Sequence, residues 1–151
     1  MRATAPNRNN MIALNFKMDL LFKSDCLEIF YDKENKLVET VWFNFAAGDE
    51  YRAGMAAYIN AISENDVKRW LGDYRKARLV NAEDEKWTSE VWAPLFMPLT
   101  IKLEKFGRVS SRDIFSEMSW SKMKEQMDLT KLPFDFREFN DYEKAKAWVI
   151  S

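Results

Sequence analysis

The sequence predicts a single α/β domain with a mixed, mostly parallel sheet of about five strands, plus a possible extra N-terminal strand, flanked by about four helices. Three observations support this fold class. The first part of the chain contains alternating and extended apolar runs, which indicate strands. From residue 48 onward, helical and extended patterns follow one another, as in sheets covered by helices. The length of 151 residues suits one hydrophobic core.

The chain is predicted to open with β structure. Ile12–Phe22 carries an apolar residue at every second position and is expected to form an amphipathic strand. Leu27–Asp32 and Leu37–Phe45 are extended runs on either side of Lys33–Lys36, a polar stretch typical of a hairpin loop. Asp49 is expected to cap the helix that follows. The apolar stripe of this helix consists of Tyr51, Met55, Tyr58, Ile59 and Ile62.

A central strand and a second helix are expected next. Val67–Tyr74 is short and apolar and is predicted as a strand. Asn81 stands three residues before Asp84, which is the spacing of a capping box at a helix start. Pro94 and Pro98 are expected to kink or end that helix, because proline lacks an amide donor and clashes with the preceding turn.

The third predicted crossover connects two further strands. Leu99–Leu103 alternates apolar and polar residues and is predicted as a strand closed by Gly107. Ser110 or Ser111 is expected to cap a helix. The apolar residues of this helix are Ile114, Phe115, Met118 and Met123. Phe134–Phe139 is predicted as the last strand.

The C-terminal segment and the domain limits complete the expected organisation. Asn140 and Glu143 have capping-box spacing and are predicted to open a final helix. The buried residues of this helix are expected to be Ala145, Trp148 and Val149. Residues 1–10 are expected to be a disordered tail and residues 11–151 one domain. No secretory signal or membrane span is apparent, so a cytoplasmic location is expected.

The composition excludes several kinds of chemistry. The chain has no histidine, which removes histidine-based triads and metal sites, and its four glycines are too dispersed for a phosphate-binding loop. The 23 basic and 24 acidic residues nearly cancel, which makes nucleic-acid binding improbable. Cys26 is the only cysteine and is expected to behave as a small hydrophobe. We therefore expect no catalytic residue, metal or cofactor, and no enzymatic activity.

One acidic residue, Asp73, is a candidate for catalysis. Asp73 ends an apolar strand, where α/β sheets usually present functional groups. The favoured interpretation is structural: Asp73 bonds a nearby backbone amide or pairs with Arg75 or Arg78.

From about Leu27 to the C-terminus the chain resembles the STAS-like family, which is related to the anti-sigma factor antagonists. The resemblance concerns the order of the elements and a few local pieces. These pieces are Val41-Trp42, Trp70–Arg75, Asn81–Asp84 with Trp87 and Trp92, and Phe139–Trp148. The predicted strand Ile12–Phe22 lies outside the family's usual pattern.

The resemblance implies a five-stranded sheet, four helices and a role in binding proteins or small ligands. In the antagonists, a serine at the start of the helix after the third strand is phosphorylated and switches partner binding. The corresponding segment here, Arg78–Glu85, contains no serine or threonine, so this switch is not carried over. The candidate partner surface is Asn81, Glu83, Asp84, Asp73 and Arg75. For the residues at the helix start, capping and complementing the helix dipole is the favoured alternative.

Two functions remain open. The first is a protein-interaction module of bacterial signalling, with homodimerisation through the strand Ile12–Phe22 as an added expectation. The second is binding of a small hydrophobic, lipid-like ligand in an aromatic-lined cavity, an idea borrowed from the looser similarity between STAS and CRAL-TRIO folds. The candidate cavity residues are Trp42, Trp70, Trp87 and Trp92.

Overall fold

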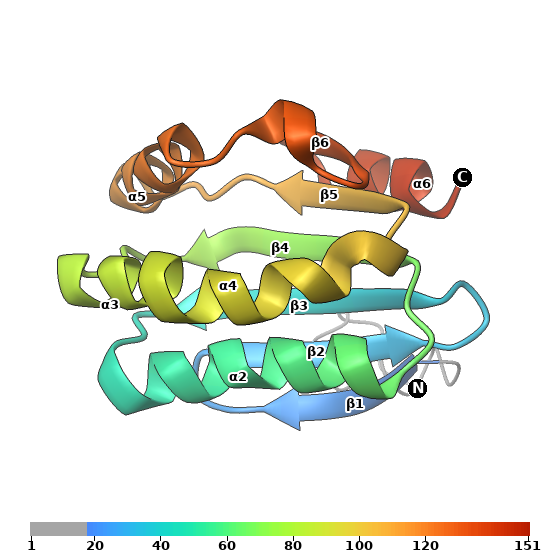
Figure 1. Cartoon of the computed structure of the whole chain (residues 1–151), viewed down its shortest axis with the longest axis horizontal. Coiled ribbons are helices and arrows are strands. Elements are labelled where there is room, and N and C mark those ends of the chain that lie inside the picture. Colours follow the sequence, from blue (N-terminus) through green and yellow to red (C-terminus); the bar gives the residue numbers. More distant parts are fainter. Residues whose placement is uncertain (1–17) are drawn as a thin grey trace, which may run out of the picture.

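The computed structural model describes residues 18–151, which form one six-stranded sheet with helices on both faces (Figure 1). The tail expected at residues 1–10, and residues 12–17 of the predicted first strand, lie outside the described residues. The strands are β1 (Met18–Lys23), β2 (Leu27–Asp32), β3 (Leu37–Asn44), β4 (Arg69–Ala77), β5 (Lys105–Val109) and β6 (Asp135–Phe139).

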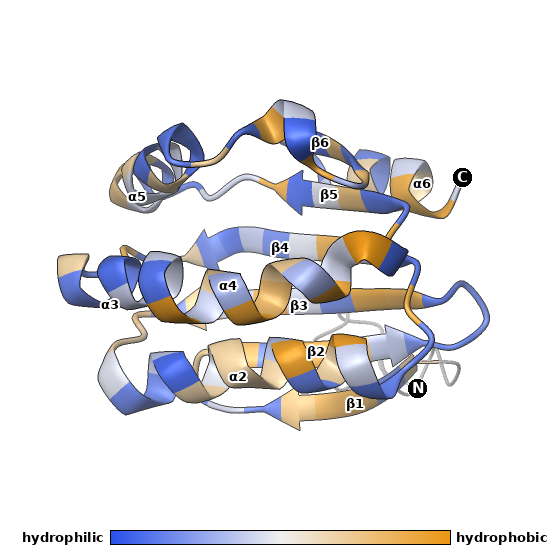
Figure 2. Cartoon of the chain, viewed as in Figure 1, coloured by the Kyte–Doolittle hydropathy of each residue, from blue (hydrophilic) through white to orange (hydrophobic). Residues whose placement is uncertain are grey.

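The strands lie side by side in sequence order, and the sheet is mixed. β1, β2 and β3 pair antiparallel, whereas β3, β4, β5 and β6 pair parallel. The described part of the predicted N-terminal strand therefore pairs within its own chain, with Met18 opposite Asp32. β1 forms one edge of the sheet and is apolar along most of its length (Figure 2). The predicted fold class, a mostly parallel α/β sheet, is confirmed.

The helical segments cover both faces of the sheet. They are α2 (Gly48–Glu64), α3 (Ala82–Trp87), the π-helix η1 (Thr88–Trp92), α4 (Ala93–Phe96), the 3₁₀-helix η2 (Met97–Lys102), α5 (Ile114–Glu125), the 3₁₀-helix η3 (Leu129–Lys131) and α6 (Tyr142–Ile150). α2 packs against β1 and β2, and α6 packs against β4, β5 and β6 from behind (Figure 1). No helix in the described part of the chain is long and apolar enough to cross a membrane.

The core is divided between the two faces. The larger part lies under α2 and the α3–η2 segment and includes Leu27, Tyr58, Trp70 and Phe96. The smaller part lies under α6 and consists of Leu37, Leu71, Val109, Ala145 and Val149. Cys26 is buried in the larger part, where burial raises the pKa of its thiol, consistent with a structural role.

The start of α2 differs from the prediction. Asp49 lies inside the first turn, and the residue at the cap position, Ala47, has no side chain that could accept a hydrogen bond. Instead, the backbone amide of Gly48 donates to the carboxylate of Asp84, at 2.9 Å. A carboxylate distant in sequence thus takes the capping role that the local pattern assigned to Asp49.

The predicted strand at Leu99–Leu103 was wrong. Residues 97–102 form η2, and the strand lies further on, at Lys105–Val109, with Gly107 at its centre rather than its end. Pro94 and Pro98 are the second residues of α4 and η2, within the first turn, where a missing amide donor is tolerated. The prolines therefore mark changes of helix type within one continuous crossover, and the short alternation from residue 99 to 103 is not a strand.

The helix predicted through Ile114 and Met123 is present as α5, but most of its apolar residues do not face the sheet. Ile114, Phe115 and Met118 are exposed, with 69%, 59% and 53% of their surface accessible, whereas Ser116 and Ser119 are buried. Small serines let the helix approach the sheet, and polar contacts described below hold it there. The cap is Asp113, which accepts from the amide of Phe115, in place of Ser110 or Ser111.

The final helix follows the prediction more closely. Ala145 and Val149 are buried and Trp148 is half-buried. Its cap is Asp141, one residue later than the predicted Asn140, and it accepts from the amide of Glu143.

Candidate functional site

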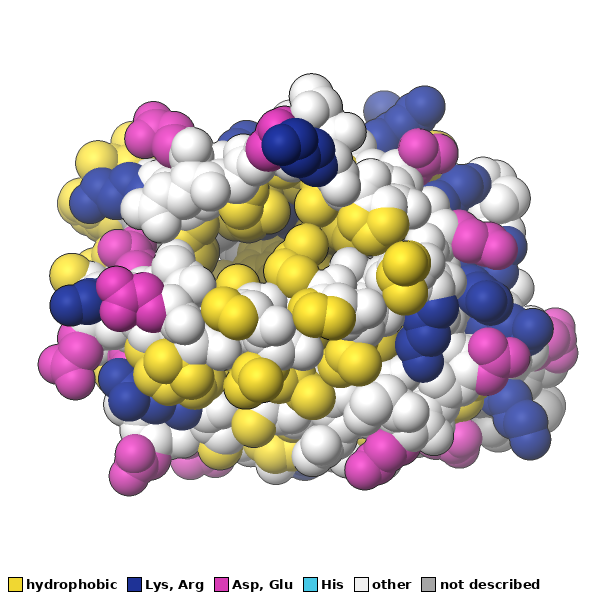
Figure 3. Space-filling view, in the orientation of Figure 1, with side chains coloured by type: hydrophobic (Ala, Val, Ile, Leu, Met, Phe, Trp, Pro, Cys, Tyr) yellow, Lys and Arg dark blue, Asp and Glu magenta, His cyan; other side chains and the backbone are white. Residues whose placement is uncertain are grey.

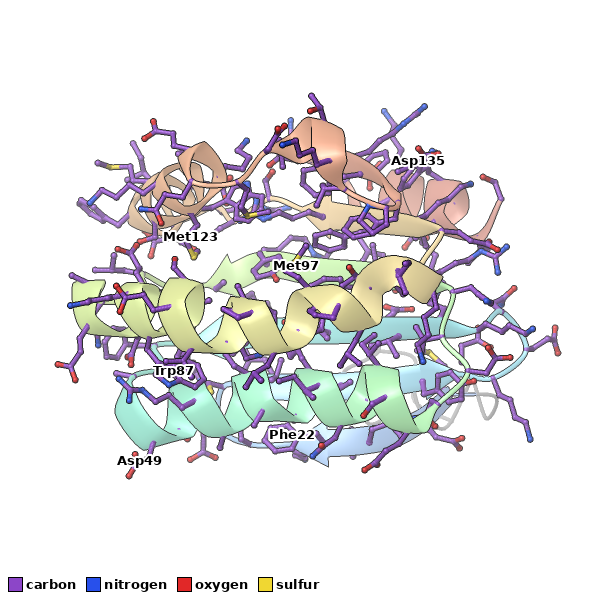
Figure 4. The ribbon with its side chains drawn as sticks, in the orientation of Figure 1. Phe22, Asp49, Trp87, Met97, Met123 and Asp135 are labelled. Carbon is purple, nitrogen blue, oxygen red and sulfur yellow. The ribbon has the colours of Figure 1, made fainter. Side chains whose placement is uncertain are left out.

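A large cavity lies on the α4 face of the sheet, between the 88–100 segment and the chain from α5 to β6. Its volume is about 520 Å³. Figure 3 shows it as a hollow with apolar side chains inside, above α4 in the orientation of Figure 1. Figure 4 labels Met97, from η2, and Met123, from α5, both of which line it. Its apolar wall is formed mainly by Trp70, Trp92, Phe96, Met97, Phe106, Trp120, Met123, Met127, Leu129, Leu132, Phe134 and Phe136.

The floor of this cavity is set by the register of the parallel strands. Trp70 on β4 is opposite Phe106 on β5, which is opposite Phe136 on β6. Residues at matching positions project to the same side, so these three rings form a row across the sheet. The rings of Trp70 and Phe106 are stacked, with centroids 3.9 Å apart and planes at 13°. Phe106 and Phe136 are 5.1 Å apart.

A second wall, which contacts the floor through Trp70 and Phe96, comes from the crossover helices. Trp92 and Phe96 are four residues apart, a spacing that places their side chains on one helix face. Their rings are stacked, with centroids 4.3 Å apart and planes at 15°. The ring of Tyr58 lies edge-on to Trp70, at 5.4 Å, and to Trp92, at 5.9 Å. The cavity is therefore bounded on two sides by flat aromatic surfaces.

The polar atoms in these walls are already hydrogen-bonded within the protein. The indole N–H of Trp70 donates to the hydroxyl of Thr40, at 3.0 Å, and that of Trp92 donates to the carbonyl of Met55, at 2.6 Å. The hydroxyl of Thr88 donates to the Asp84 carbonyl at 2.7 Å, and that of Thr100 to the Met97 carbonyl at 2.6 Å. The aromatic walls consequently present ring faces and methyl groups to an occupant, and the polar side chains of the lining also include Ser89, Gln126, Asp128 and Lys131.

Two tyrosines with raised pKa values lie beside the cavity, Tyr58 buried and Tyr74 half-buried. Burial raises the pKa of Tyr58 well above its ordinary value, and burial likewise raises the pKa of Tyr74, partly offset by the positive charge of Arg108. The hydroxyl of Tyr58 accepts from the indole N–H of Trp42, at 2.5 Å. The hydroxyl groups of Tyr58 and Tyr74 are therefore protonated at neutral pH.

A second, smaller cavity of about 100 Å³ adjoins the first. Tyr74, Trp120 and Met123 line both. The residues that line only the smaller cavity are Trp42, Asn44, Ala46, Tyr51, Met55, Ala77, Arg78, Val80, Arg108, Ser116 and Ser119. The two cavities therefore meet at a wall built from β4 and α5.

The polar part of that wall is built around the buried side chain of Arg108. This residue is 2% exposed, and its guanidinium lies between the rings of Tyr74, at 4.7 Å, and Trp120, at 4.5 Å. It pairs with the carboxylates of Glu117, at 2.9 Å, and Glu138, at 3.5 Å. Its Nε–H has no hydrogen-bond partner among the described residues.

The carboxylates around Arg108 anchor α5 to the sheet. Glu117 also accepts from the amide of Ser111, at 2.9 Å. Glu138 accepts from Lys124, at 2.7 Å, and from the indole N–H of Trp120, at 2.8 Å. Burial acts to raise the pKa of Glu138, but the hydrogen bonds from Lys124 and Trp120 outweigh it, so the pKa lies below its ordinary value. Ionic contacts thus hold α5 against the sheet.

The residues predicted as a partner surface fall into two groups on opposite faces of the sheet. In the first group, Asn81 accepts from the amide of Asp84, at 2.8 Å, and caps α3. Asp84 is 2% exposed and also pairs with Arg52, at 3.3 Å. Glu83 is exposed, 3.7 Å from Arg52. These contacts join α3 to α2.

The second group lies on the α6 face. Both carboxylate oxygens of Asp73 accept from the guanidinium of Arg75, at 2.9 and 2.7 Å, and one also accepts from the amide of Arg75, at 3.1 Å. The guanidinium of Arg75 lies over the ring of Tyr142 on α6, at 4.8 Å. The structure therefore does not bring Asp73 and Arg75 together with Asn81, Glu83 and Asp84, and binding of a partner by either group stays a prediction.

Of the four predicted cavity tryptophans, Trp70 and Trp92 line the large cavity and Trp42 lines the small one. Trp87 lines neither; it lies against Tyr51, 6.3 Å away, and under the guanidinium of Arg52. Sequence reasoning missed Trp120 and Arg108. A signal for Arg108 was present, because its strand, Lys105–Val109, places an arginine two residues after Phe106 and so on the same face.

Comparisons with known proteins add little on function. No protein-family model matches the sequence, and no curated protein matches it significantly. Among solved structures, the chain is similar to an uncharacterized protein of the DUF3478 family with a SpoIIAA-like fold from Shewanella loihica PV-4. The alignment has 12% identity and a TM-score of 0.46, and covers 87% of this chain and 91% of that one. At these values the likeness does not bear on function.

Proposed function

We propose that the chain is a binding domain, with no catalytic activity of its own, for a small and mainly apolar ligand held in the large cavity. The observation that carries this proposal is the cavity of about 520 Å³ with stacked aromatic rings on two sides. Ligand pockets usually have volumes of about 300–1,000 Å³ and apolar, aromatic linings.

The size of the cavity also favours an occupant. Protein interiors are close-packed, and voids larger than a water molecule are few. Side chains that line an empty void lose dispersion contacts, which an apolar ligand would restore. Because the indole and hydroxyl groups of Trp70, Trp92, Thr88 and Thr100 are hydrogen-bonded within the protein, the bound part of the ligand does not need to supply polar partners.

The connection from α5 to β6 is the part of the wall best suited to open. Met127, Leu129 and Leu132 from this connection line the cavity. The hydrogen bonds of residues 127–131 are local, such as those from Lys131 and Thr130 to Asp128. A segment held mainly by side-chain packing opens at lower cost than one held in a sheet. Ligand entry is therefore assigned to this side.

A substitution that fills the cavity with a large side chain tests whether a ligand binds there. Ala93 lines the cavity, and Ala93→Trp would place an indole in the space of the ligand. Ala147→Trp, on the exposed side of α6, is the matched control. The uncharged fluorescent probe N-phenyl-1-naphthylamine is expected to bind the unaltered chain and Ala147→Trp equally. It should bind Ala93→Trp at least about tenfold more weakly. Equal binding to all three proteins, or binding to none of them, would overturn the proposal.

A protein-interaction module of bacterial signalling is the second candidate. The observation in its favour is the exposed row Ile114, Phe115 and Met118 on α5, because contiguous exposed apolar surface often marks an interaction site. β1, an apolar edge strand with Leu20 and Leu21 exposed, offers a second contact and the route to a homodimer. Affinity purification with the unaltered chain and with Phe115→Lys would show one partner lost selectively from the variant. Identical recovery from both would count against α5 as the contact.

A further inference from the structure

We propose that the large cavity takes an amphiphile with one hydrocarbon chain, such as a long-chain acid or alcohol, whose chain lies on the buried floor and whose head group stays in water at the rim. The rim consists of Ser89, Gln126, Asp128 and Lys131. The inference rests on the proposed function and adds the size of the ligand, its orientation and the chemistry of its head group.

The buried part of the lining offers no unpaired polar atom to a ligand. Trp70, Trp92, Phe96 and Phe106 are at most 8% exposed. The two indole N–H groups and the hydroxyl of Thr100 are hydrogen-bonded within the protein. Within the described part of the chain, no buried side-chain nitrogen or oxygen of this lining lacks a hydrogen-bond partner. A polar head group here would lose its hydration without gaining a hydrogen bond, so this end suits only hydrocarbon.

The rim residues line the cavity on its solvent side. All four are exposed, in contrast to the aromatic floor. Figure 3 shows the same contrast, with apolar side chains inside the hollow and polar and charged atoms along its upper border. The hydroxyl of Ser89 donates to Oε1 of Gln126, at 3.3 Å, so the rim joins η1 to the end of α5. A head group at this position keeps its water and also meets donors and acceptors.

The four rim residues carry no net charge. The ammonium group of Lys131 and the carboxylate of Asp128 are 3.8 Å apart, and their side chains are 83% and 51% exposed. Exposed charges interact weakly with their surroundings, because water screens them. The rim therefore selects neither an anionic nor a cationic head group, and the selectivity of the site lies in the hydrocarbon chain.

The volume of the cavity sets the size of that chain. An engineered cavity of about 150 Å³ in another protein holds benzene, which has six carbon atoms. In proportion, a cavity of about 520 Å³ holds roughly twenty carbon atoms. One long chain fits this volume, and two long chains do not. Met97, Met123 and Met127 in the lining have flexible side chains that can follow the shape of a chain.

Two sets of competitors test this assignment by displacing N-phenyl-1-naphthylamine from the full chain, all below their micelle concentrations. In the first set, decanoate, dodecanoate and tetradecanoate, each added pair of CH₂ groups should tighten binding about fifteenfold. The second set shares one chain and varies the head group: 1-dodecanol, dodecanoate, dodecyltrimethylammonium and dodecyl maltoside. Their affinities are expected to agree within about fivefold, because the head group stays in water. Affinity that is independent of chain length, or a loss of more than about tenfold for the charged or bulky head groups, would overturn the inference.

Lys131→Glu tests where the head group lies. The variant rim carries two carboxylates, so the affinity for dodecanoate relative to that for dodecyltrimethylammonium should fall at least about fivefold. Lys144→Glu, an exposed position on α6, is the matched control and should leave this ratio unchanged. An unchanged ratio in Lys131→Glu, or an equal change in the two variants, would contradict the placement of the head group. Failure of N-phenyl-1-naphthylamine to bind the unaltered chain would instead contradict the proposed function itself.

Discussion

Gly72 shows how one residue shapes the wall between the two cavities. A Cβ atom at this position would lie 2.6 Å from Cε1 of Tyr74 and 3.2 Å from Cε1 of Phe106. The missing side chain therefore lets the ring of Tyr74 fold back along its own strand, where it stacks against Arg108. The position of the Tyr74 ring, which lines both cavities, depends on this absence.

Gly72→Ala is expected to destabilise the protein. The added methyl group overpacks the Tyr74 ring, and overpacking of a core costs about 1–3 kcal/mol. The free energy of unfolding in urea measures the effect. Gly107→Ala is the control, since its Cβ would lie 3.6 Å from its nearest neighbour, an ordinary contact distance. Equal losses for the two variants would show that the strand glycines, and not the Tyr74 contact, determine the effect.

The two tyrosines with raised pKa values predict a pH dependence at the same scale. Burial raises the pKa of Tyr58 and of Tyr74 above the ordinary value of 10.0. Above about pH 10 the unfolded chain releases these protons while the folded chain retains them, so stability should fall as the pH rises. Urea unfolding at pH 8 and pH 11 would test this. Tyr58→Phe should reduce the fall, and an unchanged fall would exclude Tyr58 as a contributor.

At the scale of elements, contacts between distant segments decide which face of a helix is buried, and local sequence patterns do not show these contacts. The strands Leu27–Asp32 and Leu37–Asn44 could be predicted, because alternating residues and a polar loop specify a hairpin locally. The orientation of α5 could not. Its apolar residues indicate one buried face, but the ion pair of Glu117 with Arg108, nine residues earlier, turns a serine-bearing face inward.

Asp84 links two elements, and its loss should affect both. Its carboxylate accepts from the amide of Gly48 and pairs with Arg52, so Asp84→Ala leaves the start of α2 without its cap. Loss of a helix cap costs about 0.5–2 kcal/mol. Thermal or urea unfolding measures the loss. Glu83→Ala, the exposed neighbour, should stay within about 0.5 kcal/mol of the unaltered chain. A comparable loss in Glu83→Ala would contradict the capping role.

At the scale of the whole molecule, the site arises where separate parts of the chain converge. The sequence pointed to Trp70 and Trp92 as cavity residues, because tryptophans on a strand and on the following helix favour a shared apolar interior. The alternation of β5 places Arg108 on the face of Phe106, but the alignment of Phe106 and Phe136 with Trp70 could not be predicted, because tertiary packing sets the register between parallel strands. The predicted strand at Leu99–Leu103 would also have removed the helical wall that holds Met97 and Thr100.

The most direct test is native mass spectrometry of the protein purified gently from its own cells. One bound small molecule is expected per unaltered chain and per Ala147→Trp chain. None is expected on Ala93→Trp, because the new indole would occupy the space of the ligand. A chain that carries no small molecule in any of the three proteins, with the cavity filled by its own side chains, would contradict the claim that this domain holds a ligand.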